Sequence, residues 1–460
     1  MAVYQRSDQA GSKSRSDTLS VVSLNILLLC NRPARSAEAA AVSEHLDALQ
    51  GYSRHTVREL SFLGDPPAAL ELEQFDVLVI HYSVAIGYLS EHYLSAAARS
   101  RVSRFPGLKV VFMQDEYRRI NLVHEALRCM GVHLLFTCVP ETEIGKVYPV
   151  SELPGLTKVH NFTGYVSEPL AGKAVAPIAA RAIDVGYRTR KPPYWLGELG
   201  AEKWQIADRF TAYAQGTDLR LDLSYQEADR FYGRAWTDFV CRCKAMLGVE
   251  SGASVFDFEG TIQRDVEAYV EQHPGAGFAE VQERFLQPHE GRIRLNQISP
   301  RCFEAAALRT AMVLYEGQYS GVLRAWRHYV PLNKDFSNFA DVLDALRDPG
   351  RLQRIADCCY DEIARNPKYG YRAFVERFDD AIEREFERRD LKRPARPYSA
   401  TRYATQVLRS PRYLAHRLYS RTLQWLLLGT PLRRFLVRLW ERVPFRTRRA
   451  VRPLLRLIGR

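Results

Sequence analysis

The chain has 460 residues, 46% of them hydrophobic and 26% charged, which is too apolar for a disordered protein and long enough for two or three domains. Its eight cysteines form no paired metal motif and no small disulfide framework, so a reducing, cytoplasmic setting is expected. The net charge of +12 is uneven, because residues 391–460 hold 18 basic residues and one acid and carry +17, which leaves −5 on the rest.

The first part of the chain alternates between strand-like and helix-like segments. Residues 1–19 are polar and serine-rich, so we expect a disordered leader. Short apolar runs then predict buried strands covered by helices on both faces. The expected strands are residues 24–30, 55–62, 76–82, 108–113 and 133–139. This alternation predicts a Rossmann-like domain with a parallel sheet over residues 20–170.

A proline-, alanine- and glycine-rich segment, residues 167–177, precedes a second α/β series over residues 180–390. The expected elements are a strand at 182–187, helices at 202–214 and 236–247, strands at 219–223 and 311–314, and one long helix over 351–388. In open parallel sheets, ligands bind at the carboxyl ends of the strands. Two such domains in tandem therefore predict a site in a cleft between them.

Residues 298–321 predict a helix start that could bind an anion. Ser299 is expected as the N-cap and Pro300 in the first turn, with Arg301 beside them. Free N–H groups there could hold a phosphate, and Glu304, one turn further on, could reach ribose hydroxyls. The alternative is an ordinary capped helix with an acid in its first turn.

Two further segments of the second domain could face a diphosphate. Gly186 and Arg188 lie in a loop expected after a strand, where a guanidinium could take two phosphate oxygens and stabilise a leaving group; a solvated basic loop is the alternative. Lys203 and Lys244 are weaker candidates. The small, glycine-rich stretch 248–254, which includes Glu250, would let a ligand approach the backbone or would simply form a turn.

The acceptor side of the predicted cleft lies in the first domain. Asp115 and His81 each follow an expected strand and could act as a general base; a helix cap and a buried core histidine are the alternatives. Asp115 is preferred. Since no Asp-x-Asp pattern suggests a divalent metal site, we expect no metal and no other cofactor.

The stretches 248–257, 298–321 and 326–338 together resemble the C-terminal half of bacterial family-1-like glycosyltransferases, and are similar to those grouped with spore-maturation glycosyltransferase-like proteins. The resemblance implies a GT-B architecture, with two Rossmann-like domains facing across a cleft and the nucleotide-sugar donor held mainly by the second. It implies that Glu304 binds the donor ribose. Asn296 stands where many retaining relatives have a second Glu, so the pattern predicts neither retention nor inversion. Donor-side candidates are Gly186, Arg188, Lys244, Glu250, Ser299, Arg301, Glu304 and Glu316.

Residues 391–460 are expected to form a basic, amphipathic helical tail. Apolar residues recur there at helical spacing between arginines, which is typical of helices that lie in a membrane interface. The expected membrane contacts are Trp425, Arg434, Arg438 and Trp440. Nucleic acid is the less favoured partner because a phosphate-tracking segment needs no apolar stripe. A helical lid or a protein partner remains a third interpretation.

These features predict a glycosyltransferase that moves a sugar from a nucleoside-diphosphate sugar to a glycan, lipid-linked or protein acceptor at the cytoplasmic face of the membrane. No apolar run approaches the ~20 residues of a spanning helix, so attachment is expected to be peripheral. The alternative is a catalytically silent scaffold of the same fold that binds a nucleotide or a glycan and recruits partners to the membrane.

Overall fold

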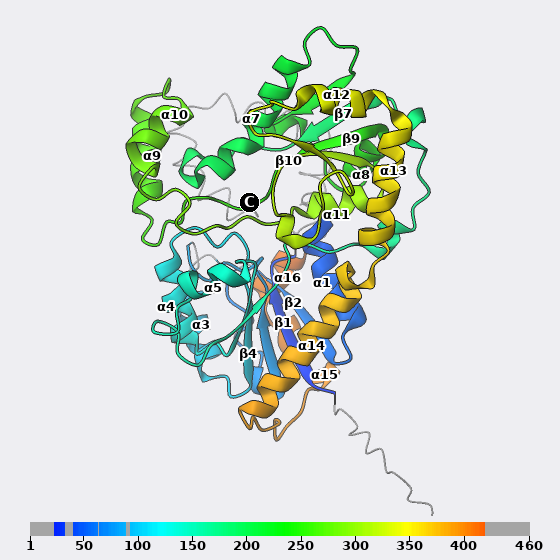
Figure 1. Cartoon of the computed structure of the whole chain (residues 1–460). Helices are drawn as coiled ribbons and strands as arrows, with labels where there is room; N and C mark the ends of the chain where they lie inside the picture. The colour runs from blue at the N-terminus through cyan, green and yellow to red at the C-terminus, as the bar shows by residue number, and fades with distance from the viewer. Residues whose placement is uncertain (1–22, 33–39, 63, 89–92, 419–460) are drawn as a thin grey trace, which may run out of the picture.

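The computed structural model describes residues 23–32, 40–62, 64–88 and 93–418 (Figure 1). It contains two α/β domains, each built on a parallel sheet, which confirms the predicted pair of Rossmann-like domains. The expected leader and the membrane contacts Trp425, Arg434, Arg438 and Trp440 lie outside the described residues.

The first domain has a six-stranded sheet in the order β2-β1-β3-β4-β5-β6, with every neighbouring pair parallel. Its strands are β1 (Asn25–Cys30), β2 (Thr56–Ser61), β3 (Val77–Ile80), β4 (Leu108–Phe112), β5 (Leu134–Thr137) and β6 (Thr157–His160). The five predicted strands are confirmed, and β6 extends the sheet at one edge. Strands β1, β3, β4 and β5 are buried along almost all of their length because helices cover both faces.

The helices of the first domain pack on the two faces of this sheet. Those between its strands are α1 (Ala40–Tyr52), α3 (Ala96–Arg104), α4 (Ile120–Met130) and α5 (Glu141–Val147). Helix α1 shares one hydrophobic cluster with one face of the sheet, and α3 and α4 share another cluster with the opposite face.

The second domain has a five-stranded parallel sheet in the order β11-β10-β9-β7-β8. Its strands are β7 (Ile183–Arg188), β8 (Leu221–Ser224), β9 (Cys243–Gly248), β10 (Ala311–Tyr315) and β11 (Val330–Leu332). In both sheets the first strand lies between the second and the third, so each sheet has a switch point where the strand order reverses.

The predicted helix over 236–247 is wrong in its second half. Helix α8 ends at Arg242, and Cys243–Gly248 forms the central strand of the second sheet. The buried residues of this strand are Cys, Ala, Met and Leu, none of which is branched at Cβ, and Ala, Met and Leu also favour helices. The local pattern therefore did not separate strand from helix.

Most helices of the second domain pack on its sheet, whereas residues 261–281 pack on the cluster shared with the first domain. The helices are α6 (Glu168–Ala171), α7 (Glu198–Tyr213), α8 (Gly233–Arg242), α9 (Thr261–Gln272), α10 (Phe278–Val281), α11 (Pro300–Ala307), α12 (Phe339–Arg347) and α13 (Pro349–Cys359). The single helix predicted over 351–388 is divided between α13 and α14 (Tyr371–Arg388). Pro367 and Gly370 lie in the break, where proline cannot continue a helix.

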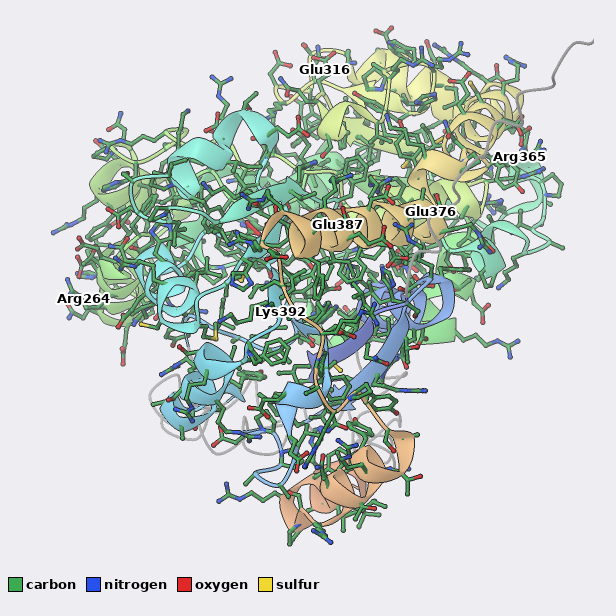
Figure 2. All side chains as sticks on the ribbon, turned by 90° about the horizontal axis from the view of Figure 1, so that it is seen from below. Arg264, Glu316, Arg365, Glu376, Glu387 and Lys392 are labelled. Atoms are coloured by element: carbon green, nitrogen blue, oxygen red, sulfur yellow. The ribbon has the colours of Figure 1, made fainter. Side chains whose placement is uncertain are left out.

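Helix α14 returns to the first domain and corrects the predicted boundary at residue 390. Its apolar residues, among them Phe374 and Phe378, belong to the hydrophobic cluster of α1 and the first sheet. Figure 2 shows the helix running across the molecule, with Glu376 and Glu387 along its outer side. The closing helix therefore completes the first domain, not the second.

The beginning of the predicted tail is also folded on the first domain. Helices α15 (Ala400–Leu408) and α16 (Pro411–Leu418) pack against the cluster on the face of the sheet opposite α14. Val407 is buried there, and Tyr413 packs against the same cluster. Within the described part of the chain, no helix is both long enough and apolar enough to span a membrane.

The segment between β9 and α11 joins the two domains. Its apolar residues share one continuous cluster with α3 and α4 of the first domain. Backbone hydrogen bonds also cross the boundary, from Asp257 N to Tyr117 O (3.0 Å), from Arg119 N to Asp257 O (2.5 Å) and from Asn121 N to Phe258 O (3.0 Å). The domains are thus held face to face by buried contacts as well as by the chain segments that pass from one to the other.

Candidate active site between the two domains

A small cavity of about 50 Å³ lies at the switch point of the second sheet. The carboxyl ends of β7 and β9 and the first turn of α11 form its walls, which is where parallel α/β sheets bind ligands. The lining residues include Gly248, which has no side chain, and several residues with polar side chains: Tyr187, Thr189, Lys203, Trp236, Ser251, Ser299 and Arg301. Of the predicted donor-side residues, Ser299 and Arg301 line this cavity.

The first turn of α11 borders this cavity through Ser299 and Arg301. Ser299 caps the helix, its hydroxyl accepting from Arg301 N at 3.4 Å, and Pro300 opens the first turn as predicted. Gly164 lies so close to Pro300 that a β-carbon there would meet the proline ring at 3.0 Å. The start of α11 is therefore fixed against the segment that connects the two domains.

Three cationic side chains gather around this helix start. Burial lowers the pKa of Lys203 to about 8; nearby Asp115 opposes this shift, while Arg190 and Arg301 add to it. Burial also lowers the pKa of Arg301. Neither Lys203 nor Arg301 has a side-chain hydrogen bond or ion pair to another described residue. The site thus concentrates positive charge that no direct ion pair between described residues neutralises, and an anionic ligand could pair with it.

Glu304 lies one turn into α11, beside the cavity. Trp236, which lines the cavity, donates its indole N–H to Glu304 Oε2 at 2.8 Å. Burial raises the pKa of Glu304 to about 7, although the Trp236 hydrogen bond and the Arg301 charge lower it. This carboxyl group is therefore oriented by a side chain of α8 and changes its charge near neutral pH.

Glu250 follows β9, and its carboxylate accepts hydrogen bonds from two loops. Its Oε2 accepts from Asn296 Nδ2 at 2.7 Å, and its Oε1 accepts from the backbone N–H of Tyr319 at 2.7 Å. Gly252, two residues later, has a φ of +115°, and a β-carbon there would collide with the carbonyl of Leu295. Glu250 thus shapes the wall of the site, and its role as a direct donor ligand stays a prediction.

A larger cavity of about 450 Å³ lies between the domains. Its polar and aromatic lining comes from both: Tyr82, Tyr88, Tyr93, Gln114, Asp115, Tyr117 and Arg118 of the first domain, and Arg190, Trp195, Gln263 and Glu267 of the second. Asp115 is exposed in it and adopts a left-handed backbone conformation with a φ of +59°. Such conformations in non-glycine residues often mark functional positions.

The two cavities belong to one polar neighbourhood. Lys203 lines the smaller cavity. Asp115 of the first domain lies close enough that its charge partly offsets the lowering of the Lys203 pKa by burial. Arg190, which lines the larger cavity, lies near both Lys203 and Tyr117. The structure therefore places a carboxylate of one domain opposite the cations of the other.

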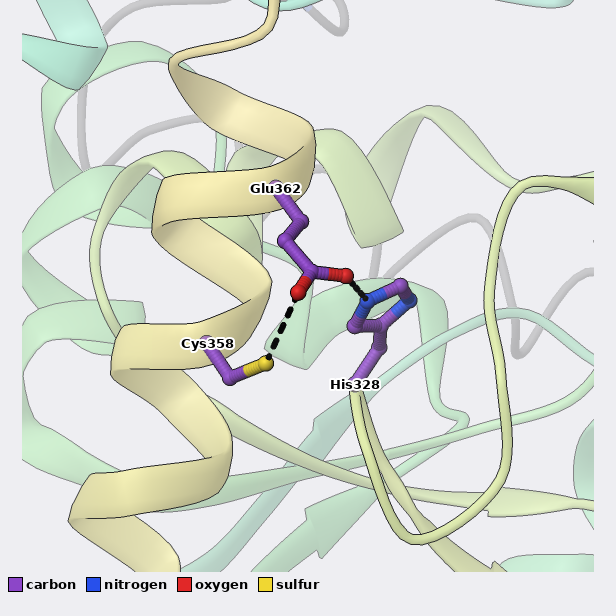
Figure 3. A group of neighbouring side chains, drawn as sticks. All are labelled: His328, Cys358 and Glu362. Carbon is purple, nitrogen blue, oxygen red and sulfur yellow. Dashed lines mark hydrogen bonds and ion pairs between the residues drawn. The ribbon is translucent and has the colours of Figure 1, made fainter.

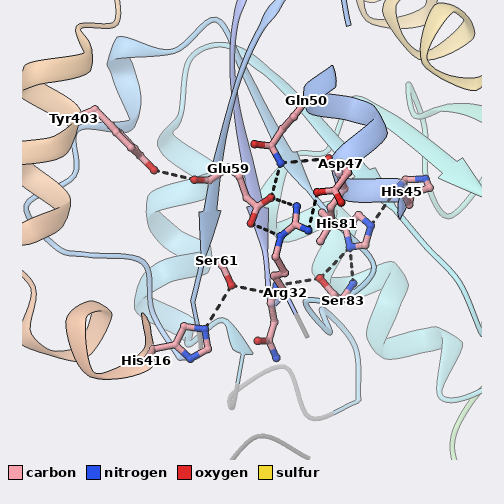
Figure 4. A network of polar contacts seen from close by, with 12 residues as sticks. Arg32, His45, Asp47, Gln50, Glu59, Ser61, His81, Ser83, Tyr403 and His416 are labelled. Atoms are coloured by element: carbon pink, nitrogen blue, oxygen red, sulfur yellow. Dashed lines mark hydrogen bonds and ion pairs between the residues drawn. The ribbon is translucent and has the colours of Figure 1, made fainter. Parts of the chain in front are cut away.

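His81 does not have the position expected of a general base. Its side chain is fully buried, with Nδ1 2.9 Å from Ser83 Oγ and Nε2 3.1 Å from His45 Nδ1 (Figure 4). Burial, followed by the charges of His45 and Arg32, holds its pKa well below the usual range. The alternative of a buried core histidine is correct.

Arg188 is also a structural residue. Its guanidinium donates to Asp222 Oδ1 at 2.6 Å and to the backbone carbonyls of Tyr187, Asp222 and Asp229. Tyr187 and Thr189 line the small cavity, so Arg188, between them, points to the opposite face of the strand. The expectation that Arg188 stabilises a leaving group is therefore wrong for this arrangement.

Three other donor-side candidates lie away from the cavities. Lys244 is at the amino end of β9, where its ammonium pairs with Asp184 at 2.7 Å, on the wrong edge of the sheet for a ligand. Gly186 is inside β7, where a β-carbon would collide with the Cys243 sulfur. Glu316 follows β10, lines neither cavity and lies at the periphery of the second domain (Figure 2).

A cluster of His328, Cys358 and Glu362 on the second domain has a composition that suits a metal (Figure 3). However, Glu362 accepts from His328 Nε2 at 2.9 Å and from the guanidinium groups of Arg324 and Arg327. These two arginines occupy the carboxylate and would repel a cation. The cluster is better explained as an ion-pair network that fixes the loop before β11 to the end of α13.

Sequence reasoning missed the two residues that best define the site. Arg190 lies two positions after the favoured Arg188, and Trp236 was treated only as part of a helix. Lys203 was named but ranked below Arg188. Side chains alternate between the two faces of a strand, so Tyr187 and Thr189 share one face of β7 and Arg188 lies on the other. The sequence could have excluded Arg188 only if the face that meets the ligand had been known.

No protein-family model matches the sequence, and no curated protein matches it. Among solved structures, an α-glucosyltransferase in complex with UDP is 12% identical, with a TM-score of 0.47 over 78% of this chain and 100% of that chain. HepE from Anabaena in complex with UDP is 10% identical, with a TM-score of 0.41 over 78% of this chain and 100% of that chain. TarM is 9% identical, with a TM-score of 0.36 over 66% and 54%, respectively. A further α-glucosyltransferase complex contains UDP-glucose and DNA with an abasic site. Similarities this distant assign no activity, so function has to rest on the site.

Proposed function

We propose that this protein is a glycosyltransferase of the GT-B type, which transfers a sugar from a nucleoside-diphosphate sugar to an acceptor hydroxyl. The observation that carries the proposal is the position of Lys203 and Arg301 in the cavity at the start of α11, at the switch point of the second sheet, with Arg190 of the larger cavity close to Lys203. Backbone N–H groups at a helix start and nearby cations are the usual means of binding phosphate oxygens.

The arrangement supports a displacement at the anomeric carbon. The acceptor oxygen forms a bond to that carbon while the bond to the diphosphate oxygen breaks, and the diphosphate leaves with the electron pair. Lys203, Arg190 and Arg301 stabilise the charge that develops on the diphosphate. Asp115, exposed in the larger cavity, takes the proton of the acceptor hydroxyl. The chemistry therefore uses groups from both domains.

Glu304 is proposed to accept hydrogen bonds from the donor ribose. Its orientation by Trp236 and its position one turn into α11 support this role. No residue of this scheme requires a metal ion, and metal independence stays a prediction. The larger cavity is proposed to hold the acceptor, which we expect to be a glycan or a lipid-linked hydroxyl, because its tyrosine and tryptophan side chains combine apolar faces with polar edges.

Nucleotide titration of the full chain tests the proposal. Calorimetry with UDP, GDP, ADP, CMP and dTDP, followed by their sugar derivatives, should identify one saturable ligand. Arg190→Ala and Lys203→Met should each weaken its binding by about tenfold or more. Lys173→Met, at an exposed lysine of the same domain, is the matched control and should leave the affinity unchanged.

The outcomes separate the enzyme from the scaffold. Binding of one nucleotide together with transfer that Glu304→Ala abolishes supports the enzyme. Nucleotide binding without any transfer, and without an effect of Glu304→Ala on other activities, supports the silent scaffold. If the folded protein binds none of these nucleotides, the assignment of the donor site is wrong.

We also propose that the protein works at the cytoplasmic face of a membrane, attached by residues 391–460. The excess of 17 positive charges in this segment supports an anionic partner. Binding to anionic vesicles, compared with binding to duplex DNA at the same ionic strength, tests this location. Stronger binding to DNA than to vesicles would favour a nucleic-acid partner instead.

A further inference from the structure

Helix α16 is attached to the first domain by the side chains that face inward. His416 Nε2 lies 3.5 Å from Ser61 Oγ, at the carboxyl end of β2, and Tyr413 packs against the hydrophobic cluster of the first sheet. Figure 4 shows His416 of α16 and Tyr403 of the preceding helix, α15, approaching β2. The polar and aromatic side of α16 is therefore directed toward the protein.

The preceding helix holds this attachment firmly. Tyr403 donates its hydroxyl to the backbone carbonyl of Glu59 at 3.1 Å. Gln406 is buried and accepts from Gln74 Nε2 at 2.9 Å and from Glu71 N at 3.3 Å. The two helices are thus part of the first domain, and α16 has a defined orientation on its surface.

The outward side of α16 is apolar. Pro411, Leu414, Ala415 and Leu418 are exposed and recur at the spacing of one helix face. Leu414 and Leu418 are 43% and 63% exposed, which makes them two of the seven large hydrophobic residues that are exposed in the described part of the chain. A helix on a water-facing surface has the opposite arrangement, with its apolar side toward the protein.

The charged residues of the segment that contains this apolar face are all basic. Arg409 and Arg412 are exposed beside it, and the segment 391–418 contains no Asp or Glu. An apolar stripe between arginines complements a lipid surface with anionic headgroups, because the leucines enter the acyl boundary while the arginines meet the phosphates. A protein groove would have to match the same stripe, and residues 391–418 would offer it no acid for ion pairs.

We infer that helix α16 docks directly on an anionic lipid surface through Leu414 and Leu418. The inference rests on the membrane location proposed above and is independent of the sugar-transfer chemistry. Because α16 is fixed to the first domain, docking would hold the domain that contributes Asp115 at a constant orientation to the bilayer. The acceptor domain, and not a free tail alone, would then sit on the membrane.

The test compares matched pairs of substitutions in the full chain. Leu414→Ser with Leu418→Ser removes the stripe, and Leu122→Ser with Val150→Ser removes two apolar side chains of similar exposure, 40% and 71%, elsewhere on the same domain. Binding is measured by co-sedimentation with phosphatidylcholine vesicles that contain about 30% phosphatidylglycerol. The first pair should weaken partitioning by about tenfold or more, and the control pair by less than about twofold.

Amide hydrogen exchange of the unmodified protein provides a second readout that needs no variant. Peptides from residues 411–418 should gain protection on these vesicles, whereas peptides from α4 should not. An unchanged partition coefficient for the Leu414/Leu418 pair would overturn the inference and leave the membrane location intact. Protection of 411–418 that is already complete without vesicles, or a dimer that the same pair dissociates, would show that another part of the chain or a second copy covers this face. Failure of the full chain to bind the vesicles at all would overturn both proposals.

Discussion

The buried ammonium group of Lys203 leads to a prediction about stability as well as binding. Burial, together with Arg190 and Arg301, lowers its pKa from the usual 10.5 to about 8. Each pKa unit corresponds to about 1.4 kcal/mol, so keeping Lys203 charged in the folded protein at pH 7 costs about 3 kcal/mol. Replacing Lys203 by Met, which is of similar length, should therefore stabilise the unliganded protein at pH 7 by an amount approaching that value.

The same shift fixes the direction of the pH dependence. Between pH 8 and 10.5 the unfolded chain binds more protons at Lys203 than the folded protein does, so the stability of the wild type rises with pH across this window. Lys203→Met lacks this contribution, and its advantage over the wild type should shrink toward zero as pH approaches 10.5.

Urea denaturation at pH 7, 8.5 and 10 measures the difference, with Lys173→Met as the control at an exposed lysine. Lys203→Met should be more stable than the wild type and should bind the nucleotide about tenfold more weakly. The reason is that the buried ammonium group destabilises the unliganded fold but binds a phosphate group of the ligand. A variant that is less stable than the wild type at pH 7, or whose advantage does not change with pH, would refute the reasoning.

Four further predictions follow from the geometry of the site and its surroundings. Asp115→Asn should lower the rate of transfer by about a hundredfold or more while nucleotide affinity changes little, as measured by release of the nucleoside diphosphate; an equal loss of both would contradict its role as the base. Because the pKa of Glu304 is about 7, its carboxylate form, and with it donor affinity, should increase as pH rises through 7, and Glu304→Gln should make the profile flat. Trp236→Phe removes a hydrogen bond that favours the carboxylate, so the midpoint of that profile should move upward; no movement would show that this bond does not control the titration. Arg188→Met should destabilise the fold by about 1–3 kcal/mol in urea, since backbone carbonyls lose their buried donor and the half-exposed Asp222 loses its ion-pair partner, whereas a stable variant that fails to bind nucleotide would restore Arg188 to the site.

The overall architecture could be predicted because it depends on repeated patterns. Long apolar runs such as 24–30 and 108–113 are typical of strands buried between helices, and their alternation with amphipathic segments specifies a parallel sheet. The capped start of α11 was predicted for the same reason, since Ser299 and Pro300 act locally. These features need no information about distant partners.

The remaining differences depend on contacts between distant parts of the chain. Strand β9 has helix-favouring residues and becomes a strand because its neighbours β7 and β10 pair with it on both sides. The role of Arg188 depends on Asp222, 34 residues away, which turns its guanidinium away from the ligand side. Lys244 was misplaced for a related reason, because a residue assigned to a helix cannot be assigned to the amino end of a strand.

The return of α14 to the first domain has a consequence for biosynthesis. The face of the first sheet that α14 covers, including Phe112 and Phe136, stays without part of its hydrophobic partner until residues 371–388 have been made. The ribosome adds about 5–20 residues each second, so roughly 200 residues separate the last strand of that sheet from its cover by about 10–40 s. During this interval the amino-terminal half is a nascent chain with an open apolar surface, which is the kind of substrate that chaperones hold. Its final folding step is therefore set by the timing of translation of a segment that lies beyond the entire second sheet.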